Sequence, residues 1–216
     1  MKKIMSFTIL CLFWISSVTF SQNMSYSEFK VGLYNPKDAK AGWMFSYGTG
    51  KTIDEAFAWM IDFGLYAKKY SKTTNVADTS FSQINENTVV KELDFSTYLL
   101  PIMFKITFDR RIAPRSPLMM KGSAGIGYQF MWNKEQNYGT GDKESRFYHG
   151  FTYQLSFGAG FEMSSSAVLF GEVFYHGGKV KRNKTETVGG LPVWKEVDMS
   201  GPGIRVGINF VNFGLF

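Results

Sequence analysis

A stretch of strict alternation between residues 146 and 162 constrains this chain more than any other feature. The odd positions are Phe147, His149, Phe151, Tyr153, Leu155, Phe157, Ala159 and Phe161, whereas the even positions are mostly small or polar. Side chains alternate across a β-strand, so the pattern predicts one strand with an apolar face and a polar face. A strand of about 16 residues is longer than the usual strand of a globular sheet. Long strands of this kind, repeated through a chain, are typical of a membrane β-barrel.

Other segments of the chain show related patterns and extend the prediction to about eight strands. They cover residues 28–34, 41–48, 56–70, 89–108, 117–132, 167–179 and 199–211. Pro101 interrupts the fourth strand, and we expect it to mark a β-bulge because proline cannot donate to a strand ladder. The predicted fold is therefore all-β, an antiparallel up-and-down transmembrane β-barrel.

The connections between these segments give an independent indication. Short connections at residues 50–55, 110–116 and 163–166 alternate with longer ones at 71–88, 133–145 and 180–197. The first connection, residues 35–40, would belong to the longer connections by its order in the chain, but it is shorter than they are. Outer-membrane barrels have short periplasmic turns and longer outer loops. An even number of strands then places both termini in the periplasm.

The N-terminus indicates export. Lys2 and Lys3 precede an apolar run over residues 4–20, and Thr19 and Ser21 occupy the small-residue positions before a cleavage site at Gln22. We therefore predict a signal peptide over residues 1–21 and one barrel domain over residues 22–216. A membrane anchor is the alternative, but the run is shorter than the roughly 20 residues that a spanning helix needs.

The composition excludes several classes of function. The only cysteine, Cys11, lies in the predicted signal peptide, so the mature chain has no disulfide, thiolate metal site or cysteine nucleophile. The net charge of +6 becomes +4 without Lys2 and Lys3. The basic residues of the mature chain are scattered, so they predict no nucleic-acid site. Aromatic residues make up 17% of the chain, which suits the two aromatic belts of a membrane barrel.

The chain resembles the small OmpA/OmpX-type outer-membrane β-barrel family. The resemblance rests on the signal ending at Gln22, the alternating strands, the stretch Tyr98–Lys105 and a last strand that ends at Phe216. Residues 211–216 depart from the alternation after Phe210. The resemblance implies an integral outer-membrane protein in contact with outer-membrane lipids. It also implies that Phe216 is a signal to the outer-membrane assembly machinery.

If the apolar face points outward, the polar face fills the barrel. The predicted interior charges are Asp62, Lys105, Lys121, Glu162, Glu172 and Arg205. An eight-stranded barrel is only wide enough for its own side chains, and an unpaired buried charge costs several kcal/mol. We therefore expect a plugged interior with paired charges and no wide pore. Inward glycines leave room for these charges, while an exposed position at the rim is the alternative for Lys105 and Glu162.

Two sequence features that could carry chemistry do not predict a functional site. Gly48–Thr52 resembles the end of a phosphate loop, but Phe45 replaces the required first glycine. His149 and His176 lie on opposite strand faces, which argues against a metal site, and no cofactor is predicted.

Two alternatives to a non-enzymatic barrel stay open. Glu172 and His176 share a strand face and could serve a lipid acyl-hydrolase, with Ser200 as a candidate nucleophile. A soluble secreted ligand carrier would place the apolar face inside. We favour a non-enzymatic scaffold whose polar outer loops contact lipid headgroups, sugars or another protein.

Overall fold

The structure, a computed structural model, describes residues 24–76, 88–138, 141–182 and 195–211. Its strands are β1 (Ser25–Tyr34), β2 (Gly42–Thr52), β3 (Phe57–Val76), β4 (Thr88–Arg111), β5 (Leu118–Asn137), β6 (Lys143–Ser164), β7 (Ala167–Gly177), β8 (Lys179–Lys181), β9 (Glu196–Asp198) and β10 (Gly201–Val211). Within these ranges, no helix is long and apolar enough to cross a membrane. The predicted signal peptide and Phe216 lie outside the described residues.

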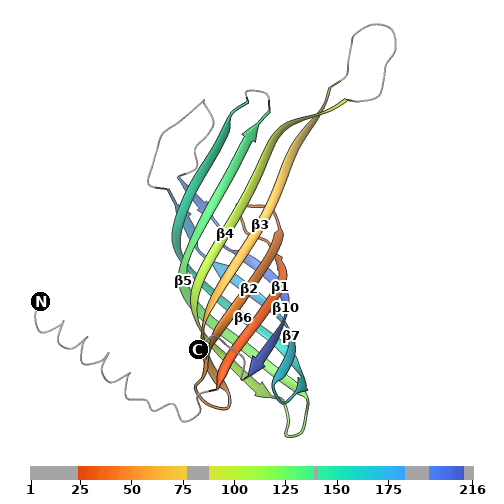
Figure 1. The fold of residues 1–216 in the computed structure, drawn as a ribbon, viewed down its shortest axis with the longest axis vertical. Helices are drawn as coiled ribbons and strands as arrows, with labels where there is room; N and C mark the ends of the chain where they lie inside the picture. Colours follow the sequence, from red (N-terminus) through yellow and green to blue (C-terminus); the bar gives the residue numbers. More distant parts are fainter. Residues whose placement is uncertain (1–23, 77–87, 139–140, 183–194, 212–216) are drawn as a thin grey trace, which may run out of the picture.

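Eight of these strands close into a ring, as the sequence predicts. Each of β1 to β6 pairs with the next strand along the chain, and β10 pairs with both β7 and β1, always antiparallel. The short strands β8 and β9 form a hairpin, and β8 pairs with β6 of the ring where Lys181 lies opposite His149. Figure 1 shows the resulting tilted cylinder.

The two ends of the cylinder carry different connections, although the connection predicted over residues 133–145 is only 138–142, because β5 continues to Asn137 and β6 begins at Lys143. Residues 53–56, 112–117 and 165–166 connect strands at one end, where β1 also begins and β10 ends (Figure 1). The connections at the other end run through residues 35–41, 77–87, 138–142 and 178–200. We call the first end the short-turn end and the second the long-loop end.

Three strands, β3, β5 and β6, are longer than the sequence predicts at the long-loop end, whereas β4 begins one residue from its predicted start. There β3, β4, β5 and β6 extend beyond β1, β2, β7 and β10 and form a wall above the cylinder (Figure 1). We call this wall the projection; it comprises residues 68–76, 88–97, 133–137 and 143–146. Its strands carry polar residues such as Lys68, Lys69 and Lys134. At this end β3, β5 and β6 were therefore predicted too short, because the prediction followed apolar alternation.

The predicted bulge at Pro101 is wrong. The β4 register continues through Pro101, which lies opposite Gln129 of β5, and it matches β3 on both sides of the proline. Gly64 of β3 makes the room, since a Cβ atom there would come within 2.7 Å of the Pro101 ring. The register shift lies instead between Lys72 and Thr73, opposite Glu92.

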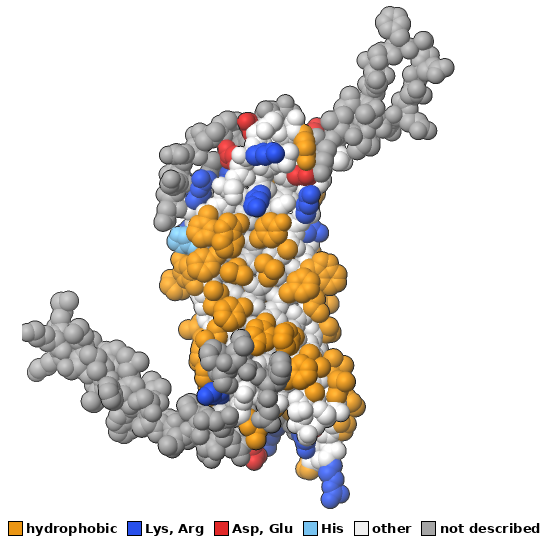
Figure 2. Space-filling view, viewed as in Figure 1, with side chains coloured by type: hydrophobic (Ala, Val, Ile, Leu, Met, Phe, Trp, Pro, Cys, Tyr) orange, Lys and Arg blue, Asp and Glu red, His pale blue; other side chains and the backbone are white. Residues whose placement is uncertain are grey.

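Large apolar side chains cover the outside of the cylinder. Figure 2 shows them as a broad band, with lysine and arginine gathered toward its two ends. Phe151 is 81% exposed and Ile126 is 70% exposed, values that no soluble core residue would have. Exposed aromatic residues occur toward both ends of the strands: Trp43, Tyr98, Trp132 and Phe147 near the long loops, and Phe57 and Phe161 near the short turns. This surface fits a bilayer and excludes the soluble carrier, whose apolar face would point inward.

Ile126→Arg tests the lipid-facing assignment. The substitution should lower the free energy of unfolding by about 2–4 kcal/mol, because an arginine would face hydrocarbon near the bilayer midplane. Urea unfolding in lipid vesicles, followed by tryptophan fluorescence, measures this change. Ser145→Arg on the projection is the control, and an equal loss in both variants would contradict the assignment.

Candidate functional site

The interior of the barrel holds a set of buried, paired charges. The acids are Glu28, Asp62, Asp109 and Glu172, and the bases are Lys30, Lys105, Lys121 and Arg205. Acids and bases are equal in number, so this set has no net charge when all its members are ionised. Pairing of this kind offsets the desolvation of each ion.

The part of this set nearest the short turns is built around Glu28 of β1. Its carboxylate pairs with Lys30 at 2.7 Å and with Lys121 of β5. Lys121 also lies 3.0 Å from Asp109, on β4. The Tyr26 hydroxyl completes the cluster, accepting a hydrogen bond from Lys121 at 2.7 Å and lying 2.5 Å from Asp109.

Asp62 of β3 connects this cluster to the centre of the barrel. Its two oxygens lie 2.8 Å from Lys30 Nζ and 2.7 Å from Lys105 Nζ. Lys105 also donates to Gln154 on β6 at 2.9 Å. Gly125 faces Lys105 across the β4–β5 pair, and a Cβ atom there would lie 2.4 Å from Lys105 Cγ. The glycine is therefore required for the lysine to lie inside the ring.

A second central pair joins β7 and β10. Glu172 and Arg205 are direct cross-strand neighbours and form a buried salt bridge. Ser156 donates to the other oxygen of Glu172 at 2.7 Å. Gly158 of β6 lies opposite Glu172 of β7, and a Cβ atom on this glycine would come within 2.7 Å of the Glu172 Cβ.

Five of the predicted interior residues lie in this set: Asp62, Lys105, Lys121, Glu172 and Arg205. Glu162 does not join them, because it lies at the short-turn rim and pairs with the exposed Arg111 at 2.6 Å. Lys105 is fully buried, so it is not a rim residue.

The sequence analysis missed Glu28, Lys30 and Asp109. A signal for the first two was present, since Glu28, Lys30 and Gly32 alternate with Phe29, Val31 and Leu33. Asp109 continues the inward phase of Lys105 and Thr107.

The two histidines occupy different faces, as expected. His149 points outward and bonds through Nδ1 to the Tyr128 hydroxyl at 2.5 Å. His176 is fully buried inside, where Nε2 lies 2.9 Å from Thr152 Oγ1 and 2.8 Å from Gln129 Oε1. Among the described residues, no group of three or more His, Cys, Asp or Glu side chains is placed to hold a metal ion.

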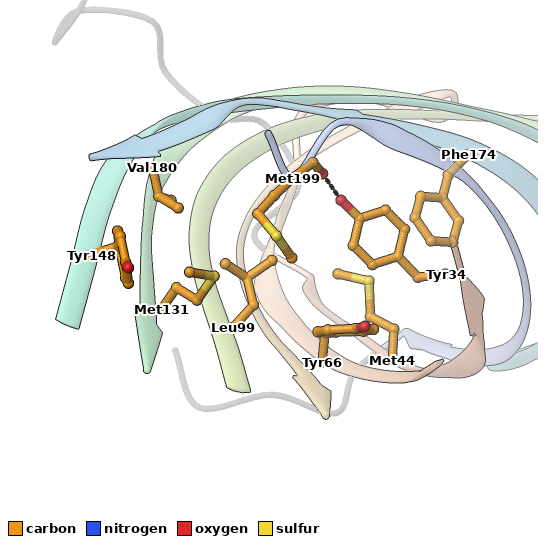
Figure 3. Close-up of a cluster of buried hydrophobic side chains, with 9 residues drawn as sticks. All are labelled: Tyr34, Met44, Tyr66, Leu99, Met131, Tyr148, Phe174, Val180 and Met199. Atoms are coloured by element: carbon orange, nitrogen blue, oxygen red, sulfur yellow. Dashed lines mark hydrogen bonds between the residues drawn. The ribbon is translucent and has the colours of Figure 1, made fainter. Parts of the chain in front are cut away.

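An apolar layer covers the charged set on the side of the long loops. Figure 3 shows its members pointing toward one another from most strands of the ring: Tyr34, Met44, Tyr66, Leu99, Met131, Tyr148, Phe174, Val180 and Met199. Tyr34 donates a hydrogen bond to the Met199 carbonyl, which ties the β9–β10 segment across the barrel mouth. The sequence analysis expected only polar groups inside, although several of these residues are apolar and in the inward phase.

Above the apolar layer lies a cavity of about 530 Å³, which we call the vestibule. Its floor is part of the apolar layer, and its walls come from the projection, the β1–β2 connection and the β9 region. The lining residues are Asp38, Ala39, Lys40, Tyr66, Lys68, Tyr70, Leu93, Phe95, Thr97, Met131, Asn133, Glu135, Arg146, Tyr148, Val197 and Met199. Leu93, Phe95 and Thr97 of β4 all point inward and line the inside of the projection.

The β8–β9 hairpin closes one side of the vestibule. Glu196 pairs with Lys179 at 2.8 Å and with Lys181 at 3.2 Å, and hydrogen bonds from these lysines lower the pKa of Glu196. The Asp198 amide donates to the Asp38 carboxylate at 2.8 Å, which fixes the hairpin to the β1–β2 connection.

Asp62→Asn tests the importance of the buried set. The change should lower the free energy of unfolding by about 3–5 kcal/mol, because Lys105 would stay fully buried without its carboxylate partner. Glu162→Gln, which removes an acid from the exposed rim, should change it by less than about 0.5 kcal/mol. Urea unfolding in vesicles compares the two variants, and similar losses would show that burial of the pair is not what matters.

Comparison with known proteins gives structural matches without sequence matches. No family model matches the chain, and no curated protein matches it. The Neisserial surface protein A has a similar structure, with a TM-score of 0.52, 11% identity, and coverage of 88% of this chain and 99% of that one.

Two further solved structures are more distant. A major outer membrane protein of Thermus thermophilus matches with a TM-score of 0.49, 9% identity, and coverage of 87% of this chain and 99% of that chain. Ail of Yersinia pestis, the attachment invasion locus protein, matches with a TM-score of 0.47, 12% identity, and coverage of 88% and 97%. By its fold, the chain is an eight-stranded antiparallel β-barrel similar to those of small outer-membrane proteins.

Proposed function

We propose that this chain is a non-enzymatic outer-membrane protein with a closed interior, whose long-loop end binds ligands at the cell surface. The observation that carries the proposal is the combination of a filled barrel and an open vestibule above it. An eight-stranded ring leaves little space beyond its own side chains. The paired charges and the apolar layer occupy that space, so the binding surface lies outside the bilayer.

The surroundings of His176 argue against the acyl-hydrolase alternative. Its Nε2 atom is engaged by Thr152 and Gln129 inside the ring, and Thr152 and His176 are both buried. Glu172 is committed to Arg205 and Ser156, so it does not orient the imidazole. The Ser200 hydroxyl accepts a hydrogen bond from the Gly178 amide. A lipid ester outside the barrel has no access to this histidine.

The proposed orientation places the short turns in the periplasm and the projection outside the cell. Barrels of this class keep short turns on the periplasmic side. Both termini are then periplasmic, where Phe216 would meet the assembly machinery. No feature of the described surface suggests nucleic acid as a partner.

Outer-membrane lipids are the proposed neighbours of the projection's outward face. Lys69, Lys134 and Lys143 lie together on this face, with Asp94 as the nearby acid. They stand just beyond the exposed Trp132 and Phe147. Aromatic side chains mark the level of the membrane interface, so these lysines are placed to contact anionic headgroups.

Conductance measurement tests the closed interior. The purified barrel, inserted in a planar lipid bilayer, should give no steady current above that of the protein-free bilayer, because side chains fill the ring. A general porin in the same bilayer is the positive control. Stable, stepwise channels that scale with the amount of protein would contradict the proposal.

Cysteine labelling in intact cells tests the orientation. A membrane-impermeant maleimide should label Ser145→Cys on the projection without any treatment. It should label Glu55→Cys, in the β2–β3 turn, only after the outer membrane is permeabilised. Removal of the signal peptide would also remove Cys11, so each variant would carry one thiol. The reverse pattern of labelling would invert the proposed topology.

A further inference from the structure

The vestibule has the dimensions of a small-molecule site. Its volume of about 530 Å³ lies within the range of known ligand pockets, and its floor is rigid because the ring closes beneath it. Tyr66 donates a hydrogen bond to the Lys40 carbonyl, and this contact fixes the β1–β2 connection over the edge of the cavity. A molecule in the vestibule would therefore lie on a preformed surface.

The lower part of the vestibule is apolar. Tyr66, Met131, Tyr148 and Met199 form its floor, and Phe95 extends the apolar surface up one wall. Thr97 and Asn133 add a polar strip on the β4–β5 pair, where the Thr97 hydroxyl and Asn133 Oδ1 lie 3.4 Å apart. Methionine side chains adapt to ligands of different outline, and the tyrosines offer flat faces to an aromatic or aliphatic body.

The charges around the vestibule are separated between two walls. On the β5–β6 wall, the buried Arg146 lies 3.1 Å from Glu135 and 2.6 Å from Glu144, so two carboxylates satisfy one guanidinium. On the opposite wall, Lys40 and Lys68 form no ion pair with a carboxylate among the described residues, and Asp38, the acid on that side, accepts a hydrogen bond from the Asp198 amide. Lys40 instead lies over the Tyr70 ring, 5.4 Å from its centroid.

This separation of charges favours the binding of an anionic ligand over a cationic one. The two lysines are free to bind a carboxylate, sulfonate or phosphate, and Lys40 and Tyr70 stand where the apolar wall meets solvent. A cation would have to compete with Arg146 for Glu135 and Glu144, or with the Asp198 amide for Asp38. A ligand without charge would leave the lysines unused.

From these observations we propose that the vestibule binds a small anionic amphiphile, with its apolar body on the floor and its anionic head at Lys40 and Lys68. The inference rests on the proposed surface-binding function and specifies the chemical class of the ligand. Its failure would leave the predictions of a closed barrel and of its orientation untouched, since those are measured by conductance and labelling.

Three probes with one body and different heads test this proposal. They are 1-naphthoate, 1-naphthalenemethanol and 1-naphthylmethylammonium, which are titrated onto the full mature chain in lipid nanodiscs. Methionines labelled with ¹³C at the methyl group report binding by NMR. Partition of each probe into empty nanodiscs is measured separately, so that affinities refer to the free probe.

We expect naphthoate to shift the Met131 and Met199 methyl signals saturably and to leave Met60, which is buried among the lower side chains, unchanged. It should bind about fivefold more tightly than the alcohol, as expected for two partly exposed lysines, and the ammonium probe should bind weakest. The Lys40→Gln/Lys68→Gln variant should lose the preference for naphthoate.

Lys134→Gln/Lys143→Gln is the matched control, because it removes two lysines from the outward face of the projection. This variant should keep the preference for naphthoate. The proposal fails if no probe shifts Met131 and Met199 saturably, if the three probes bind equally, or if the Lys40/Lys68 variant keeps the preference. Heat-modifiable migration in gels verifies that each variant is folded.

Discussion

Ion pairing inside the closed sheet is the interaction on which the rest of this structure depends. The ring turns one face of every strand toward lipid and the other toward a narrow lumen. Glu28, Asp62 and Glu172 could not remain ionised there without Lys30, Lys105, Lys121 and Arg205. Because each pair joins different strands or adjacent inward positions, the pairs also oppose slippage of the register. A shift by one residue would place these charges in hydrocarbon.

The apolar layer gives the two ends of the molecule different roles. It separates the charged lumen from the vestibule, so a ligand above the layer meets tyrosine and methionine side chains instead of the ion pairs. The projection then raises the walls on one side only, while the β8–β9 hairpin closes the other through Asp198 and Asp38. A plugged barrel can thus carry a preformed binding surface outside the bilayer, as expected for loops on a rigid scaffold.

Much of the fold could be predicted from alternation, and the exceptions have physical causes. The strands, the short turns and most of the interior charges follow from a period of two. Pro101 suggested a bulge because proline disrupts a ladder, but Gly64 on the neighbouring strand accommodates its ring. The ends of β3, β5 and β6 were missed because polar strands beyond the membrane lose the apolar signal. Glu162 occupies an inward-facing position of its strand but lies at the rim, because the alternation gives the face of a residue and not its position along the barrel axis.

The amino-acid sequence by itself determined the two faces of each strand, because side-chain direction is a local property of the extended backbone. It also determined which end has the short turns. Only the tertiary structure decided which charges pair, because Lys121 of β5 meets Glu28 of β1, and Asp62 of β3 lies between Lys105 of β4 and Lys30 of β1. The vestibule likewise exists only after closure, because the ring, the projection and the hairpin contribute its walls from separate segments.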